Sequence, residues 1–325
     1  NNTQTKTKLI PKLRFKEFEG DWNKKRLNSI NIKVIDGDRG KNYPNGKDFL
    51  NEGYCLFLNA KNVTKKGFSF TVTSFINKEK DLLLRKGKLK KFDIVLTTRG
   101  SVGHIAYYNE NIQFENLRIN SGMVLIRTDS KFVEPNYLNR YFRSNQIQNE
   151  IKKISFGSAQ PQLTVGEIVK FKIAFPNLQE QQKIASFLTA VDTKIQQLTT
   201  KKELLENYKK GVMQQLFSQQ LRFKNDDGAD FSDWEEKKLG EVAYITTGSS
   251  NRVDSSLDGK YTFFDRSEDI RTSSIYLFDS EAIIVPGEGQ KFTPKYFIGK
   301  FDLHQRSYAI MNFNNCVGKF IFYHI

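Results

Sequence analysis

A stretch of about forty residues, 178–220, constrains the fold of this chain more than any other. It contains no proline, and Gly211 is its single glycine. Apolar residues recur along it at steps of four and three, the seam pattern of a coiled-coil helix. The predicted seam comprises Ile184, Leu188, Val191, Ile195 and Leu198, then, after a one-residue shift, Leu205, Tyr208, Val212 and Leu216. A helix of this length is a rod of roughly 60 Å, and its seam needs a partner helix from this chain or another.

The chain repeats itself on either side of this rod. The pattern Leu13-Arg14-Phe15-Lys16, Trp22 and Lys24-Lys25-Arg26-Leu27 returns as Leu221-Arg222-Phe223-Lys224, Trp234 and Glu236-Lys237-Lys238-Leu239, with a four-residue insertion. An internal repeat outranks local propensity as a guide to architecture. We therefore predict an α+β protein with a first mixed α/β domain at 1–176, a spacer helix at 177–220 and a second, related domain at 221–325. The second copy is shorter, and we expect it to lack its C-terminal part and a second spacer helix.

Composition favours a polyanionic partner. The 325 residues carry 51 Lys and Arg against 36 Asp and Glu, a net charge of +15, and 38% are hydrophobic, enough for real cores. A basic balance of this kind is typical of nucleic-acid-binding proteins. Cys55 and Cys316 are far apart in the sequence, which suggests neither a disulfide framework nor a zinc site. With no apolar run long enough to span a bilayer and a polar start that is no signal peptide, we expect a cytoplasmic protein.

The two copies predict matching elements. In the first copy we expect strands at 30–35, 54–58, 93–97, 104–108, 121–127 and 170–175, a helix at 135–153, and loops at 36–47 and 156–163. In the second copy, 261–269 matches 54–62, 282–285 matches 94–97, and 307–311 matches 121–125. The chain ends where the counterpart of the 135–153 helix would begin.

No catalytic site can be assembled from the sequence. His104, His304 and His324 do not lie at metal-ligand spacing, and there is no phosphate-binding glycine loop or nucleophilic-serine turn. Glu288 near Lys291 superficially suggests a nuclease, because a carboxylate and a lysine can hold Mg²⁺ and a scissile phosphate. The spacing differs from the usual strand-borne pattern, and the first copy has Ser101 and Gly103 in that turn. We interpret Glu288 as a polar loop residue and expect no metal.

The polar loops are better suited to contacting DNA bases. Arginine can grip guanine, and asparagine or glutamine can grip adenine, each through two hydrogen bonds. Binding residues also gather in loops on a rigid scaffold. The candidate DNA-binding residues are Asn59, Lys61, Asn62, Arg99, Ser101, Ser158, Gln160 and Gln162 in the first copy, and Arg266, Arg271, Gln290, Lys291, His304, Gln305 and Arg306 in the second. We expect Lys65, Lys66 and the lysines of 86–91 to contact phosphates rather than bases.

Two reading heads joined by a rod would read two short DNA segments with an unread gap. One turn of B-DNA is about 34 Å. A rod of roughly 60 Å can therefore separate the heads by one to two turns, depending on its tilt.

The chain resembles the specificity subunit of type I restriction–modification systems. The resemblance rests on the paired openings at 13–27 and 221–239, on 156–174 (FGSAQPQLTVGEIVKFKIA), on 179–192 (QEQQKIASFLTAVD), on 261–271 and on 286–305. It implies two target-recognition domains that read a split site in double-stranded DNA, and two conserved helices that pair to space them. It also implies a non-catalytic subunit on which two methyltransferase and two restriction subunits dock. S-adenosylmethionine, ATP and Mg²⁺ would then belong to those partners, with no cofactor in this chain. The partner of the long helix would come from a second copy or a separate fragment.

Two other functions stay open at this stage. One is a site-specific DNA endonuclease that uses Glu288, which Mg²⁺-dependent cleavage by the isolated chain would favour. The other is a structural adaptor that joins proteins through the rod without reading DNA.

Overall fold

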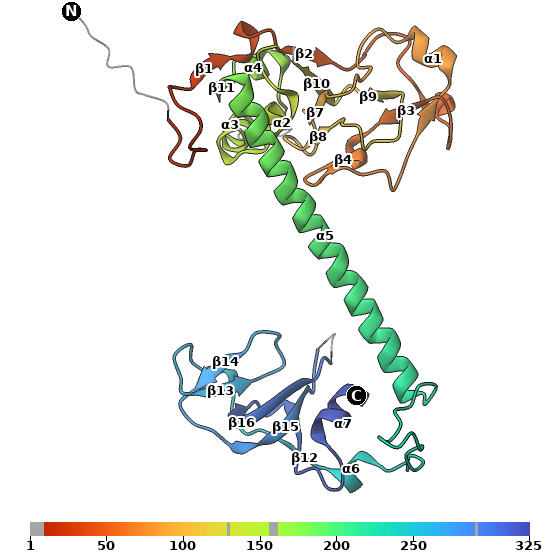
Figure 1. Cartoon of the computed structure of the whole chain (residues 1–325), viewed down its shortest axis with the longest axis vertical. Helices are drawn as coiled ribbons and strands as arrows, with labels where there is room; N and C mark the ends of the chain where they lie inside the picture. The colour runs from red at the N-terminus through yellow and green to blue at the C-terminus, as the bar shows by residue number, and fades with distance from the viewer. Residues whose placement is uncertain (1–9, 129–130, 156–161, 290–291) are drawn as a thin grey trace, which may run out of the picture. The chain divides into compact units, whose positions relative to one another are not determined.

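A computed structural model of the chain describes residues 10–128, 131–155, 162–289 and 292–325. The chain forms two compact units, residues 1–197 and 198–325, and each is described by itself. The long helix α5 (Leu178–Phe217) begins in the first unit and ends in the second (Figure 1). The fold is therefore of the predicted mixed helix-and-strand class with a long helix. The boundary between the two units lies inside α5.

The first unit is built on two main sheets. An antiparallel four-stranded sheet has the order β2-β10-β7-β8, comprising β2 (Lys33–Asp36), β10 (Met123–Arg127), β7 (Ile94–Thr97) and β8 (Ile105–Tyr107). A three-stranded sheet has the order β6-β3-β9, comprising β6 (Phe75–Ile76), β3 (Cys55–Leu58) and β9 (Leu117–Ile119). The short strands are β4 (Val63–Thr64) paired with β5 (Gly67–Phe68), and β1 (Asn23–Arg26) paired with β11 (Lys172–Phe175). The helices are α1 (Lys78–Leu83), α2 (Pro135–Arg143), α3 (Asn145–Ser155) and α4 (Val165–Ile168).

The two central strands of the four-stranded sheet, β10 and β7, are buried on both faces. Because side chains alternate along a strand, Ile94 and Leu96 of β7 pack in one core with Phe142 of α2, while Val95 packs in another core with Leu56 of β3. Burial on both faces explains why these strands appear in the sequence as continuous apolar runs rather than as alternating ones. The sheet is therefore a rigid support for the loops at its ends.

The helix predicted at 135–153 is interrupted. Pro135 begins α2, but Ser144 has an extended backbone (φ −66°, ψ 151°), and α3 starts at the next residue. The prediction of one continuous helix was therefore wrong at this point. The break lets both helices bury their apolar faces in one core, with Leu138 and Phe142 from α2 and Ile147 and Ile151 from α3.

The start of α5 is fixed in the first unit by a buried carboxylate. Glu180 is fully buried and accepts hydrogen bonds from Arg14 Nε (2.8 Å), Arg14 Nη2 (2.7 Å) and Trp22 Nε1 (3.2 Å). The next residue, Gln181, is also fully buried and donates to the carbonyls of Phe132 and Pro176. The Leu-Arg-Phe…Trp opening and the Gln-Glu-Gln-Gln segment, about 160 residues apart, therefore meet in one structural contact.

The second unit is organised around one six-stranded sheet of order β12-β17-β15-β16-β13-β14. Its strands are β12 (Tyr244–Thr247), β17 (Ser307–Met311), β15 (Phe278–Pro286), β16 (Lys295–Leu303), β13 (Tyr261–Phe264) and β14 (Arg271–Ser273). Its helices are α6 (Leu239–Val242) and α7 (Gly318–His324), and the last turns of α5 belong to it.

The strand orders of the two units are equivalent. In the first unit β10 lies antiparallel between β2 and β7, and β3 runs parallel to β9. In the second, β17 lies antiparallel between β12 and β15, and β13 runs parallel to β16. The single strand β16 pairs with both β15 and β13. In the first unit two strands divide this role, because β8 pairs with β7 and β9 pairs with β3. The internal repeat in the sequence is thus a repeat of topology.

In each copy, a glycine directly after the first strand of the main sheet lets two backbone segments approach closely. A β-carbon on Gly37, directly after β2, would lie 2.2 Å from the carbonyl oxygen of Asn120, which follows β9. A β-carbon on Gly248, directly after β12, would lie 1.8 Å from the carbonyl oxygen of Leu303, the last residue of β16. Only glycine allows two backbones to approach so closely. These contacts hold the loops at one end of each sheet against one another.

The predicted seam of α5 is exposed along its middle. Leu188, Val191, Ile195, Leu198, Leu205 and Tyr208 each expose between 36% and 70% of their surface, whereas Ile184, Val212 and Leu216 are half-buried. A row of this kind is the surface that a partner helix would cover. That partner helix stays a prediction.

A search of the described residues for helices long and apolar enough to cross a membrane found none.

Candidate nucleic-acid interface

In the first unit, the loops after four strands meet at one edge of the sheets. The amide of Asn120, after β9, donates to the carbonyl of Leu58, the last residue of β3 (3.2 Å). The amide of Thr98, after β7, donates to Gly122 (2.8 Å). Two predicted site residues, Asn59 after β3 and Arg99 after β7, therefore lie on neighbouring loops of one edge. Arg99 is exposed and forms an isolated bridge with Gln162.

Asn62 is not available to a base. Its side chain is fully buried, and its amide nitrogen donates to the carbonyls of Ser69 (3.0 Å) and Val72 (2.7 Å). Its side-chain oxygen accepts from the amide of Asn59 (3.0 Å). Because every strong polar group of this side chain is used inside the protein, we assign Asn62 to the loop scaffold rather than to base recognition. The neighbouring Lys61 is exposed.

A basic cluster lies beside this edge on two interlocked loops. The Asp38 carboxylate accepts the amides of Gly40 (2.8 Å) and Arg85 (2.7 Å), which ties the loop after β2 to the loop after α1. These backbone hydrogen bonds, from Gly40 first and then from Arg85 and Lys86, hold the pKa of Asp38 below its usual range against the opposing effect of burial. The two loops enclose a cavity of about 300 Å³, whose cationic lining residues are Arg39, Lys41, Arg85 and Lys86.

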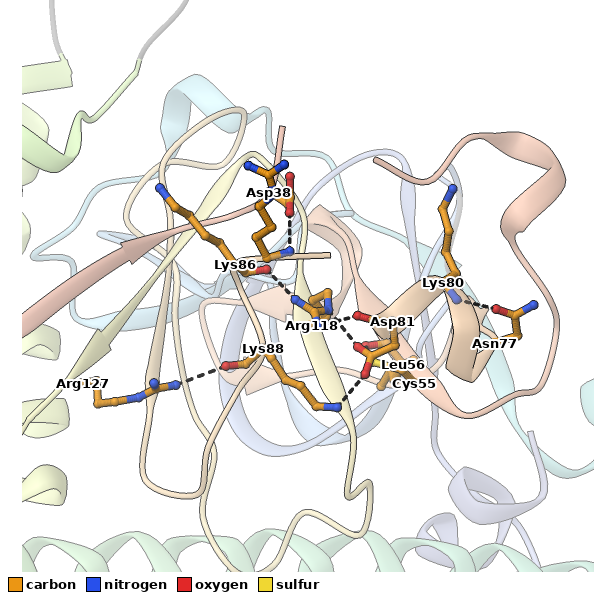
Figure 2. A network of polar contacts seen from close by, with 11 residues as sticks. Asp38, Cys55, Leu56, Asn77, Lys80, Asp81, Lys86, Lys88, Arg118 and Arg127 are labelled. Carbon is orange, nitrogen blue, oxygen red and sulfur yellow. Dashed lines mark hydrogen bonds and ion pairs between the residues drawn. The ribbon is translucent and has the colours of Figure 1, made fainter. Parts of the chain in front are cut away.

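The backbone of this basic loop is anchored by a buried ion pair (Figure 2). Arg118 of β9 is 3% exposed and donates its Nε to Asp81 Oδ1 (2.8 Å) and its two terminal nitrogens to the carbonyls of Asp81 (2.9 Å) and Lys86 (2.6 Å). Lys88 donates to the other Asp81 oxygen (2.5 Å), and Arg127 donates to the carbonyl of Lys88 (3.1 Å). The Lys86 backbone is therefore held in place by Arg118, while the Lys86 side chain is exposed.

Burial and charge act in opposite directions within this network. Burial alone would raise the pKa of Asp81, but the hydrogen bonds from Lys88 and Arg118 outweigh it and hold that pKa below its usual range. Burial, together with the adjacent Asp81 carboxylate, raises the pKa of the Cys55 thiol to about 12. Cys55 is therefore a protonated core residue at neutral pH and not a reactive thiolate.

The second unit gathers its polar residues at the equivalent edge. A cavity of about 190 Å³ lies among the loops after β12, β13 and β16, and its lining residues are Asn251, Arg252, Asp265, Arg266, His304, Gln305 and Arg306. Gln305 Nε2 donates to Asn251 Oδ1 (2.7 Å), and the amide of Arg306 donates to His304 Nδ1 (3.0 Å). Four residues predicted from the sequence, Arg266, His304, Gln305 and Arg306, thus come together here.

Glu288 is held between two arginines. Its Oε2 lies 2.7 Å from Arg266 Nη1 and its Oε1 lies 2.9 Å from Arg306 Nη1, and all three side chains are exposed to a similar degree. Because each Glu288 oxygen pairs with one guanidinium group, the carboxylate orients both Arg266 and Arg306. Among the residues that the structure describes, no group of three or more His, Cys, Asp or Glu side chains could hold a metal ion.

The other predicted residues lie elsewhere or outside the described part. Arg271 begins β14 and does not line the cavity of the second unit. Ser101 is exposed in the turn after β7, where its carbonyl accepts from Thr97. Ser158, Gln160, Gln290 and Lys291 lie outside the described residues.

Sequence reasoning missed several residues of these two edges. Asn251, Arg252 and Asp265 line the second cavity, and Arg39, Lys41 and Arg85 line the first. The internal repeat could have identified them, because aligning the loop after β2 with the loop after β12 places residues 37–42 beside residues 248–252.

Asp265, which lines the second cavity, is 3% exposed. Burial would raise its pKa, but hydrogen bonds from Ser267 and the charges of Arg252 and His304 hold that pKa below its usual range.

The chain has two sheet units of equivalent topology, and each has a polar edge. Both units are continuous with one long helix. These features define a class of duplicated recognition modules. Residues 19–207, more than half of the chain, match the family model described as "Type I restriction modification DNA specificity domain". The chain belongs to this family.

Individual relatives agree with that membership. The chain is 28% identical over 173 residues to the MjaIX specificity subunit of Methanocaldococcus jannaschii, covering 49% of this chain and 38% of that protein. It is 26% identical over 240 residues to the MjaX specificity subunit of the same organism, described as putative in its name, covering 70% and 54%. The chain thus spans about half or less of these relatives. The type I S subunit structure from M. genitalium shares the fold, with a TM-score of 0.62 at 17% identity over 97% of this chain and 78% of that one.

Proposed function

We propose that this chain is a DNA sequence-recognition subunit of a type I restriction–modification complex that reads a bipartite target. One observation carries the proposal: both units collect arginine, asparagine and glutamine side chains at the same ends of equivalent strands. These side-chain types suit guanine and adenine edges in the major groove. Loops that follow strands of a packed sheet have the rigidity that base recognition needs.

The long helix supports the bipartite part of the proposal. Its 40 residues correspond to roughly 60 Å, and it belongs to both units. In the proposed function it sets the distance between the two reading heads, and so the length of the unread gap. Its exposed seam then pairs with a second helix, as the family resemblance implies.

We further propose that the chain is non-catalytic and acts in the cytoplasm as a scaffold. Two methyltransferase and two restriction subunits would dock on it, and S-adenosylmethionine, ATP and Mg²⁺ would act in those partners. Glu288 supports the non-catalytic part, because its two oxygens are occupied by Arg266 and Arg306. Mg²⁺-dependent cleavage of duplex DNA by the isolated chain would favour the nuclease instead.

Sequence recognition is tested by selecting duplexes from a randomised pool with the 325-residue chain at 0.15 M salt. The enriched duplex and a shuffled copy of it are then compared by equilibrium binding. We expect the enriched duplex to bind about 10³-fold or more tightly than the shuffled copy, the lower end of specific protein–DNA recognition. Equal affinities for both duplexes would overturn the proposal and favour the structural adaptor.

The basic cluster at Arg85 and Lys86 is expected to contact phosphates. Both side chains are exposed, and within the described residues neither has a carboxylate at ion-pair distance. Replacing Arg85→Gln and Lys86→Gln together should weaken binding to enriched and shuffled duplexes alike. It should also reduce the slope of log K against log salt by about one to two, because each phosphate contact contributes about 0.9.

The matched control for the Arg85 and Lys86 variant is Lys24→Gln with Lys25→Gln. This pair removes the same charge from β1, where both lysines are exposed. The control should leave the salt slope nearly unchanged. An equal change of slope in both double variants would show a general charge effect and contradict a phosphate contact at Arg85 and Lys86.

Glu288 is expected to restrain non-specific binding by the second unit. Replacing Glu288→Gln removes the anion that neutralises Arg266 and Arg306. Because these are exposed pairs, whose strength is about 0.2–1 kcal/mol, affinity for the shuffled duplex should rise about two- to fivefold. Affinity for the enriched duplex should rise less, since the arginines lose their orientation. Fluorescence anisotropy with both duplexes measures this, and a fall in affinity for the shuffled duplex would contradict the role.

A further inference from the structure

The turn between β16 and β17, formed by His304, Gln305 and Arg306, has a backbone that is fixed inside the second unit. The His304 amide donates to the carbonyl of Phe264, the last residue of β13 (2.9 Å), and the Gln305 amide donates to the carbonyl of Ser250 (3.0 Å). The Arg306 amide donates to Nδ1 of His304 (3.0 Å). Because all three amides have partners within the protein, the side chains of Gln305 and Arg306 extend from a rigid support.

A buried carboxylate holds this turn against the loop after β12. Asp302 is fully buried, and its Oδ1 accepts hydrogen bonds from Ser250 Oγ (2.6 Å) and from the amide of Leu303 (2.8 Å). Ser250 is itself 6% exposed. The Ser250 carbonyl that accepts the Gln305 amide therefore has a defined position, and the loop and the turn are held together as one structure.

The side chain of Gln305 is oriented by Asn251. Gln305 is exposed, and its Nε2 donates to Asn251 Oδ1 at 2.7 Å. Among the described residues, Asn251 is the only hydrogen-bond partner of this side chain. The second amide proton of Gln305 and its Oε1 are therefore available to a ligand. One donor and one acceptor on the same amide match N7 and the N6 amino group of adenine.

Arg306 has a fixed backbone and an oriented side chain. Its carbonyl accepts from the amide of Gly287 (3.0 Å), and its Nη1 lies 2.9 Å from Glu288 Oε1. The guanidinium group is 59% exposed. An arginine has five N–H donors in a planar fork, so the pairing with Glu288 leaves donors for a second partner. Two of them can bind O6 and N7 of guanine.

We propose that Gln305 and Arg306 contact neighbouring base pairs of the half-site that the second unit reads, with Gln305 binding an adenine and Arg306 binding a guanine. Asn251 and Glu288 are positioning residues for these two side chains. Consecutive Cα atoms lie about 3.8 Å apart, close to the rise of roughly 3.4 Å between base pairs. The inference rests on the proposed sequence recognition and adds which side chain contacts which base.

The Gln305 contact is tested by removing one atom from the adenine. Selection from randomised duplexes with the 325-residue chain and with Gln305→Ala identifies the position at which a preference for adenine is lost. There the unaltered chain should favour adenine by about 5- to 150-fold, the discrimination of a two-point contact, and Gln305→Ala should bind all four bases alike. Replacing this adenine by 7-deazaadenine, which lacks the N7 acceptor, should weaken the unaltered chain about fivefold or more and leave Gln305→Ala unchanged.

The positioning role of Asn251 has its own signature. Asn251→Ala should lower the preference for adenine at the Gln305 position and leave the guanine position unaffected. Asn251→Asp should restore that preference, because a carboxylate oxygen accepts the Gln305 amide as Asn251 Oδ1 does. The matched control is Asn314→Ala, which removes an exposed amide beyond the other end of β17 and should leave both preferences intact.

The Arg306 contact is tested without a change of charge. Arg306→Lys keeps the positive charge but loses the planar fork, so the preference for guanine at the neighbouring position should fall about fivefold or more. Replacing that guanine by 7-deazaguanine should weaken the unaltered chain and leave Arg306→Lys unchanged. The matched control is Arg222→Lys, another arginine paired with an exposed carboxylate, that of Asp233 at 3.2 Å. It should preserve the preference for guanine.

The outcomes separate this inference from the proposed function. If a duplex is enriched but neither Gln305→Ala nor Arg306→Lys alters a base preference, the two contacts are overturned while sequence recognition stands. A loss of adenine preference in Gln305→Ala that 7-deazaadenine does not reproduce in the unaltered chain would overturn the direct contact. If the unaltered chain enriches no duplex, the proposed function and this inference both fail.

Discussion

Deleting residues 198–204 from α5 should shorten the unread gap between the two recognised segments by about three base pairs. Seven helical residues correspond to about 10.5 Å, and one base pair to about 3.4 Å. The deletion places Leu205 where Leu198 stood, so the predicted seam stays in phase. It rotates one unit against the other by only about 20°, the mismatch of a heptad with the α-helical repeat. Both half-sites should therefore still be recognised, at a new spacing.

The gap is measured by selection from randomised duplexes with the unaltered and shortened chains. A deletion of five residues, 198–202, is the matched control, because it rotates the units by about 140° at 100° per residue and breaks the seam. The control should lose joint recognition of the two half-sites rather than shift their spacing. An unchanged gap in the seven-residue deletion would contradict the role of α5 as a spacer.

Replacing Arg118→Met should destabilise the first unit by about 3–5 kcal/mol at neutral pH. Asp81 is 1% exposed, and the substitution leaves its buried carboxylate with Lys88 alone. Removing one partner of a buried ion pair costs this much because the remaining charge is uncompensated. The second substitution Asp81→Asn, added to Arg118→Met, should recover more than half of the loss. Urea unfolding followed by circular dichroism measures both, and a loss below about 1 kcal/mol would contradict the anchoring role.

The same pair predicts a pH dependence of stability. The pKa of Asp81 is lowered in the folded chain, so its contribution is present above the unfolded value of about 3.9 and is lost as the pH falls through the folded pKa. In Arg118→Met the carboxylate is less compensated and takes up a proton more readily. The difference in stability between the two proteins should therefore shrink as the pH is lowered from 7 towards 4. A constant difference across this range would show that charge is not the cause.

The sequence was informative where one local pattern decides the structure. The helix expected at 178–220 is α5 at Leu178–Phe217, and the strand expected at 54–58 is β3 at Cys55–Leu58. Repeated spacing of apolar residues determines such elements. The repeat of the opening motif likewise predicted two related units, which the equivalent strand orders confirm.

The interfaces were harder to predict because their contacts join distant residues. Asn62 looks like any loop asparagine in the sequence, yet its amide is used by Ser69 and Val72 inside the fold. Arg118 and Asp81 lie on different elements 37 residues apart, so no local pattern links them. The break at Ser144 is set by the packing of α2 and α3 in a shared core, which helical spacing alone does not reveal.

Exchange of one reading head tests the account most directly. Residues 54–163 are replaced by the equivalent segment of another family member with a different target, and duplexes are selected with the parent and the exchanged chain. We expect one half-site to change completely while the other half-site and the length of the gap stay the same. Unchanged recognition of both half-sites after the exchange would contradict the account, because the replaced sheet edge would then read nothing.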